Sequence, residues 1–183
     1  MRLSTIQTKN NLFIEKNRKG TCWMKELIED LEKRKKTASR PPEDKIQRLH
    51  SLGFGTARER IEKCVDPDSF IEFGVLNHSE YPELQEKTPA DGLVVGLAKV
   101  GGRPVVIQAT DKTVFAGTGA TVQNRKSRMI HEFAKKRGLP IFNLVEGGGL
   151  RMPDGMGSDG ISSKMMSMHL IKHNREVPLI TGI

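Results

Sequence analysis

The chain has 183 residues, 28% of them charged and 5% aromatic, so its core must be built mainly from aliphatic side chains. A formal net charge of +8 is consistent with a lysine-rich surface or with an anionic partner. A phosphate-bearing small molecule fits this charge as well as nucleic acid does, and no motif for nucleic-acid recognition is present. The two cysteines form no C-x-x-C pair and no apolar run could span a bilayer, so we expect neither a zinc ribbon nor a membrane protein.

The cysteine content also bears on the compartment. No disulfide pattern is visible, which indicates a reducing environment, and we expect the cytoplasm. The basic N-terminus has no acidic residue before Glu15 and loosely resembles an organelle transit segment, although it lacks the density of arginine and serine typical of one. A mitochondrial or other organelle matrix is therefore the alternative.

The first part of the chain predicts two helices and a strand. Apolar residues at helical spacing indicate a helix over 23–36, and the proline-containing residues 37–43 break it, so residues 1–43 form an N-terminal extension with one helix and a linker. Thr56 and Glu59 form a capping box that starts a short helix over 57–64. Residues 69–75 read as a strand.

The second part predicts an α/β fold. Two apolar runs, 92–100 and 103–110, flank Gly101-Gly102 and indicate a β-hairpin, and the second run is apolar enough to be covered on both faces. A helix over 122–137, with Met129, Ile130, Phe133 and Ala134 on its apolar face, ends at Gly138. A strand over 141–145, a helix over 160–174 and a strand over 178–183 follow, which predicts parallel strands joined by right-handed crossovers.

Two glycine-rich stretches are the candidates for chemistry. Gly147-Gly148-Gly149 follows the apolar strand, and glycines there let backbone N–H groups approach a ligand and hold a developing oxyanion. Gly117-Thr118-Gly119 precedes a helix whose N-terminus could receive a phosphate or a carbonyl, although a tight turn explains the same residues. No Ser/His/Asp set can be assigned from spacing.

Other motifs are weaker. Residues 155–160 match G-x-G-x-x-G, but they do not directly follow a strand, so a loop with Asp159 as helix N-cap is the preferred interpretation over a nucleotide site. His169 and His173 have the spacing of a metal pair without the glutamate of H-E-x-x-H, and we expect no metal.

Six motifs in order resemble the carboxyltransferase (β) subunits of biotin-dependent acyl-CoA carboxylases, of the propionyl-CoA and acetyl-CoA type. They are TARERI at 56–61, DPDSFIEFG at 66–74, DGLVVG at 91–96, GRPVV at 102–106, TVFAGTG at 113–119 and EGGGLR at 146–151. The resemblance covers about residues 24–183 and implies a crotonase-like superhelix of β-β-α units. Residues 44–183 would then be part of the N-terminal, acyl-CoA-binding domain of such a subunit.

The resemblance also implies the chemistry. Carboxybiotin on a partner carrier is the co-substrate, and backbone N–H groups hold the thioester enolate of acyl-CoA while it is carboxylated. On the matching positions, Gly148 and Gly149 would be the oxyanion pair, and Gly117, Thr118, Gly119 and Arg151 would bind substrate. Glu146-Gly147 stands where the family has Asp-Ser.

The implied partners follow from the same resemblance. They are biotin carboxylase and biotin carrier subunits in an oligomer, together with the carboxyltransferase C-terminal half, which the chain lacks or a partner supplies. Because the chain ends on the apolar strand VPLITGI, we expect it either to be incomplete or to pair with another chain. Two alternatives remain: a non-catalytic assembly module of a carboxylase complex, and a subunit of a related malonyl-type thioester decarboxylase.

Overall fold

The computed structural model describes residues 23–152 and 176–182, and the chain divides into two compact units, Met1–Thr37 and Ala38–Ile183. The helix predicted over 23–36 is present and runs over 23–39. Its apolar residues Trp23 and Ile28 are more than half exposed. No helix was predicted directly after it, but α2 spans Glu43–Ser51 and shortens the linker. Only Leu49 of α2 is buried, so its apolar periodicity is too sparse to reveal it.

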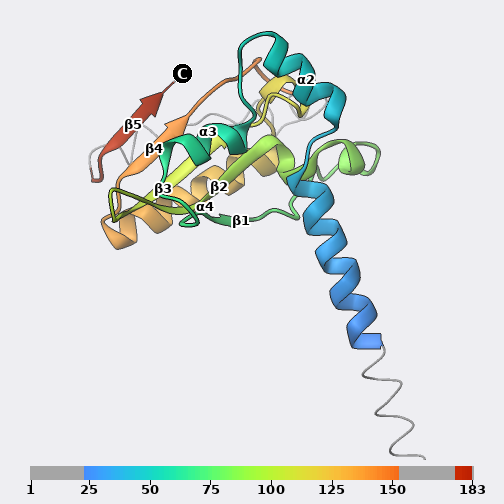
Figure 1. The fold of residues 1–183 in the computed structure, drawn as a ribbon, viewed down its shortest axis with the longest axis horizontal. Helices are drawn as coiled ribbons and strands as arrows, with labels where there is room; N and C mark the ends of the chain where they lie inside the picture. Colours follow the sequence, from blue (N-terminus) through green and yellow to red (C-terminus); the bar gives the residue numbers. More distant parts are fainter. Residues whose placement is uncertain (1–22, 153–175, 183) are drawn as a thin grey trace, which may run out of the picture. The chain divides into compact units, whose positions relative to one another are not determined.

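The second unit contains a five-stranded sheet in the order β1-β2-β3-β4-β5 (Figure 1). The strands are β1 Ile71–Phe73, β2 Leu93–Val100, β3 Arg103–Thr110, β4 Ile141–Leu144 and β5 Leu179–Gly182. β1, β2 and β3 pair antiparallel, whereas β3, β4 and β5 pair parallel. The predicted hairpin is confirmed, because Val100 pairs with Arg103 across Gly101 and Gly102, whose φ angles are +57° and +77°.

The sheet is covered on both faces, as its apolar strands predict. The helix α3, Ala57–Cys64, packs on one face and α4, Thr121–Arg137, on the other (Figure 1). Alternate residues of β3 lie on opposite faces of the sheet, since Ile107 belongs to the hydrophobic cluster under α3 and Val106 to the hydrophobic cluster under α4. The capping box of α3 is present: Thr56 N–H donates to Glu59 at 2.8 Å.

The helix α4 follows the prediction at its end but not along its whole face. Gly138 takes a left-handed conformation, and its N–H donates to carbonyls of the last turn. Ile130 and Ala134 are buried as predicted, but Met129 is 50% exposed, and the buried side of α4 instead includes Lys126. The prediction for Met129 was wrong because polar contacts around Lys126, described below, take the place of an apolar stripe.

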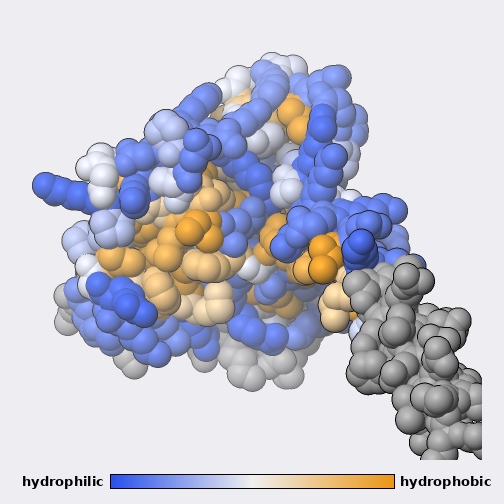
Figure 2. Space-filling model, turned by 60° about the horizontal axis from the view of Figure 1, so that its bottom comes forward, coloured by the Kyte–Doolittle hydropathy of each residue, from blue (hydrophilic) through white to orange (hydrophobic). Residues whose placement is uncertain are grey.

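Short 3₁₀ helices link the larger elements: η1 Pro82–Lys87, η2 Pro89–Gly92 and η3 Phe115–Gly117. The predicted helix 160–174, the G-x-G-x-x-G motif at 155–160, and His169 and His173 lie outside the described residues. Within the described ranges, no helix has the length and apolar character needed to cross a bilayer. Figure 2 shows a face on which hydrophobic residues form a connected area bordered by hydrophilic ones.

Candidate functional site

Two glycine-rich loops leave neighbouring parallel strands at the same edge of the sheet. One loop follows β3 and leads into α4, and the other follows β4. The parallel register pairs Gln108 with Asn143 and Ala109 with Leu144, so both loops begin side by side at the carboxyl ends of the strands. Open α/β sheets commonly bind ligands at this position.

The two loops touch through their backbones. A Cβ atom at Gly117 would lie 2.4 Å from the carbonyl oxygen of Glu146, and one at Gly148 would lie 3.0 Å from that of Ala116. Gly119 N–H donates to Gly149 O at 2.7 Å, and Arg151 N–H donates to Gly119 O at 2.8 Å. The glycines therefore permit a backbone approach that larger residues would prevent.

The N–H groups of Gly147, Gly148 and Gly149 are available as donors. Within the described residues, none of these three groups donates a hydrogen bond, and all three glycines are exposed. The N–H groups of Gly117 and Gly119, in contrast, already donate to Val114 O and Gly149 O. Consecutive unengaged donors at an exposed turn can hold a carbonyl oxygen as it gains negative charge.

A buried ion pair supports the second loop. Arg151 Nη2 lies 2.6 Å from Asp91 Oδ1, and both side chains are almost completely buried. Asp91 has a left-handed φ of +49° and also accepts a hydrogen bond from Gln123 N–H at 2.7 Å. Arg151, which the family resemblance implies as a substrate-binding residue, thus faces the protein interior. Sequence reasoning missed its partner, although Asp91 lies in the DGLVVG motif.

A buried lysine holds the turn that carries Asp91. Lys126 Nζ donates to Ala90 O at 2.9 Å and to Leu93 O. Burial lowers the pKa of Lys126 from 10.5 to about 8, while the carboxylates of Glu72 and Asp91 oppose that change. Nothing in the sequence distinguishes Lys126 from the other lysines of α4, so this role was not predictable.

A second charged group precedes the glycines directly. Glu146 lies between two cations, 3.4 Å from Arg60 Nη1 and 3.1 Å from Lys112 Nζ, and its side chain is only 8% exposed. Arg60 Nη2 also donates to Thr110 O at 2.7 Å, and Glu146 N–H donates to Thr110 Oγ1 at 3.2 Å. This network anchors the start of the β4 loop to the end of β3.

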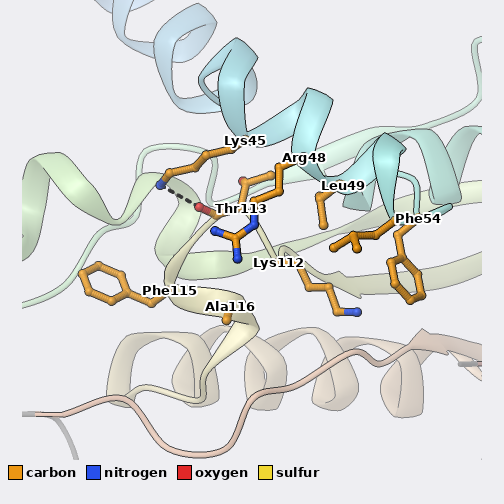
Figure 3. Close-up of a pocket in the computed structure, with 9 residues that line it drawn as sticks. Lys45, Arg48, Leu49, Phe54, Lys112, Thr113, Phe115 and Ala116 are labelled. Carbon is orange, nitrogen blue, oxygen red and sulfur yellow. Dashed lines mark hydrogen bonds between the residues drawn. The ribbon is translucent and has the colours of Figure 1, made fainter.

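A hollow of about 430 Å³ lies between α2 and the loop after β3 (Figure 3). Its lining residues are Lys45, Arg48, Leu49, Leu52, Phe54, Lys112, Thr113, Phe115 and Ala116. Lys45 Nζ donates to Thr113 O at 2.8 Å, and Lys112 Nζ lies 3.9 Å from the centre of the Phe54 ring. Among the described residues of this lining, three are cations, two carry aromatic rings and none is a carboxylate, so we name this hollow the basic pocket.

A second hollow, of about 340 Å³, is lined by both glycine-rich loops, and we name it the glycine cavity. Gly117, Gly119, Gly147 and Gly149 contribute to its wall. Phe115 and Ala116 of the same β3 loop line the basic pocket. A ligand that filled both hollows would therefore pass along residues 115–119. In the described part of the chain, no three His, Cys, Asp or Glu residues gather where they could hold a metal ion.

The fold and the paired glycine-rich loops define a crotonase-like carboxyltransferase domain. The chain belongs to the carboxyl transferase domain family, whose model matches residues 48–183. It is 35% identical over 161 residues to the biotin-dependent acetyl-/propionyl-coenzyme A carboxylase beta5 subunit of Mycobacterium tuberculosis, a match that covers 85% of this chain. The prediction of the family and of the crotonase-like fold is thus confirmed.

Two solved structures of carboxyltransferases have the same fold as this chain. The transcarboxylase 12S hexamer with hydrolysed methylmalonyl-coenzyme A bound has a TM-score of 0.75 at 28% identity, covering 86% of this chain and 32% of that one. A single-chain, multi-domain long-chain acyl-CoA carboxylase has a TM-score of 0.74 at 32% identity, covering 85% and 17%. The chain spans 29% of the length of the M. tuberculosis relative, so it corresponds to a part of the proteins it matches.

Proposed function

We propose that this chain is the acyl-CoA-binding part of the carboxyltransferase component of a biotin-dependent acyl-CoA carboxylase. The unengaged N–H groups at Gly148 and Gly149 carry the proposal, because a thioester enolate needs donors fixed at its oxygen. Loss of one such donor typically costs about 3 kcal/mol of transition-state stabilisation. A side-chain nucleophile is not required for this chemistry.

The two glycine-rich loops would have different roles. Gly148 and Gly149 would donate to the thioester oxygen in the enolate, while Gly117, Thr118 and Gly119 would lie on the opposite side of the glycine cavity. Carboxybiotin, carried by a partner subunit, would supply the carboxyl group. Arg151 would act from behind the loop, since its side chain pairs with Asp91 in the interior.

The basic pocket would bind the nucleotide end of coenzyme A. Its three cations suit phosphate groups, and its Phe54 and Phe115 rings suit a planar base. Because one loop lines both the basic pocket and the glycine cavity, a bound thioester could place its phosphates in the former and its acyl group in the latter. The net charge of +8 would favour the approach of such an anion.

Calorimetric titration of the full chain with propionyl-CoA tests the proposal. We expect binding that weakens about tenfold when Arg48→Gln removes a cation from the basic pocket. Arg125→Gln is the matched control, because Arg125 is an exposed arginine outside both hollows and should leave the affinity unchanged. Absence of propionyl-CoA binding, with and without the biotin-carrying partner subunits, would overturn the proposal.

The non-catalytic assembly module is the second candidate function. It is favoured by one departure from the family's motif, because Glu146-Gly147 stands where the carboxyltransferases have Asp-Ser. Sizing the purified chain alone and with partner subunits separates the two candidates. An assembly module would join the complex and bind no acyl-CoA, whereas a carboxyltransferase component would do both.

A further inference from the structure

The floor of the glycine cavity is a chain of three buried polar side chains. Gln108 and Asn143 are register partners on β3 and β4, and Gln108 Nε2 donates to Asn143 Oδ1 at 2.8 Å. Ser127 of α4 donates through its Oγ to Gln108 Oε1 at 3.1 Å. The exposed fraction is 4% for Gln108, 7% for Asn143 and 7% for Ser127, and all three residues line the cavity.

The chain of hydrogen bonds runs in one direction and ends at a donor. Ser127 donates to Gln108, and Gln108 donates to Asn143, so the Asn143 Nδ2 group is left to donate to a further acceptor. Among the hydrogen bonds of residues 23–152 and 176–182, none is donated by Asn143 Nδ2, and this atom is not one of the fully buried polar atoms that lack a partner. Because Asn143 lines the cavity, its amide N–H groups are placed to donate to a ligand oxygen there.

The charge of the cavity narrows the choice of ligand. None of the described residues that line it is ionisable. A second carboxylate would therefore meet no cation among the described residues of this lining, and burial of an unpaired charge is unfavourable. A neutral oxygen, as in a hydroxyl or keto group, satisfies the amide without this penalty.

We propose that Asn143 is a specificity-determining residue that binds a neutral oxygen on the acyl group of the substrate. The acyl thioester would carry a hydroxyl or keto oxygen on its chain, in preference to a plain alkyl chain of the same length. The inference rests on the proposed acyl-CoA function, since Gly149 and Asn143 line one cavity and the acyl group would extend from the former toward the latter. Gln108 and Ser127 are positioning residues that orient the Asn143 amide.

Paired titrations of the full chain with 3-hydroxybutyryl-CoA and butyryl-CoA test this inference. The wild-type chain should bind the hydroxyacyl thioester about tenfold more tightly, as one additional hydrogen bond in a buried site predicts. Asn143→Leu should bring the ratio close to one by weakening 3-hydroxybutyryl-CoA while butyryl-CoA binds as well as before. If Asn143→Leu misfolds, it will lose both ligands. Ser127→Ala deletes only the first hydroxyl of the hydrogen-bond chain, and the binding of the two thioesters is then compared in that variant.

The outcomes separate the two proposals. Equal binding of both thioesters by the wild-type chain would overturn the role of Asn143 and leave the acyl-CoA function intact. Failure of both thioesters to bind, with or without partner subunits, would remove the acyl-CoA function itself. A preference for the hydroxyacyl thioester that survives in a folded Asn143→Leu chain would also contradict the inference, because another group would then have to recognise the oxygen.

Discussion

Arg151 and Asp91 form an ion pair of 2.6 Å in the interior, joining the loop after β4 to the turn before β2. The two residues are 60 positions apart in the chain. The Arg151 backbone N–H simultaneously bonds Gly119 O, so the same residue connects three segments around the glycine cavity. A buried pair of this kind fixes geometry more than it adds net stability.

Removing one partner of this pair should therefore be strongly destabilising. We expect Arg151→Met to lower the free energy of unfolding by about 3–5 kcal/mol, because it leaves the Asp91 carboxylate buried without its cation. Urea denaturation measures the change. Arg125→Met breaks the exposed pair with Glu80 and should cost about 1 kcal/mol or less, so equal losses in the two variants would contradict the structure.

Lys126 should make stability depend on pH in the alkaline range. Its pKa falls from 10.5 to about 8 on folding, so between these values the unfolded chain binds more protons than the folded chain. The Lys126 contribution to the free energy of unfolding should thus rise with pH from about 8 to about 10.5, by up to about 3 kcal/mol. Below pH 8 both states are protonated and the cost of burying the charge is fully present.

The comparison with Lys126→Met isolates this contribution from other groups that titrate. The difference in unfolding free energy between the wild type and the variant should be flat from pH 6 to about 7 and should then shift in favour of the wild type as the pH rises through 8. Chemical denaturation at a series of pH values provides both curves. Parallel curves up to about pH 10 would show that the pKa of Lys126 is not lowered.

Gly117→Ala should disturb the contact between the two loops. The new Cβ would lie 2.4 Å from Glu146 O, and the backbone has a φ of +69° that disfavours alanine. Gly53→Ala is the matched control, since Gly53 has a φ of +81° but nothing within 4 Å of a Cβ. We expect about 1–2 kcal/mol of destabilisation from backbone strain in both variants, and a further loss together with weaker propionyl-CoA binding in Gly117→Ala alone.

The elements that sequence reasoning predicted well have local signals. Thr56 and Glu59 are three residues apart, Gly101 and Gly102 lie between two apolar runs, and Gly138 directly follows its helix. Each of these signals depends on a conformation within one turn of the chain, so tertiary structure does not need to be known. The helix α2 escaped prediction because packing of Leu49, and not an apolar stripe, stabilises it.

The site depends on contacts that no local pattern encodes. The glycines at 117 and 148 were predicted to lie at the site, but their approach to Glu146 O and Ala116 O follows from the parallel register of β3 and β4. Arg151 was expected to bind substrate because the family resemblance implies it, whereas its burial could be known only from its pairing with Asp91. A charged side chain is placed by its partner, and the partner is set by the fold.

The N–H group of Gly148 allows a direct test of the proposed chemistry. Gly148→Ala and Gly148→Pro each add a Cβ that would lie 3.0 Å from Ala116 O, but only proline removes the N–H group. If this donor holds the enolate oxygen, Gly148→Pro should reduce carboxylation by the reconstituted complex about 100-fold relative to Gly148→Ala. Propionyl-CoA binding should change much less, because the donor acts mainly on the developing charge. Equal activity of two folded variants would show that the Gly148 N–H group takes no part in the reaction.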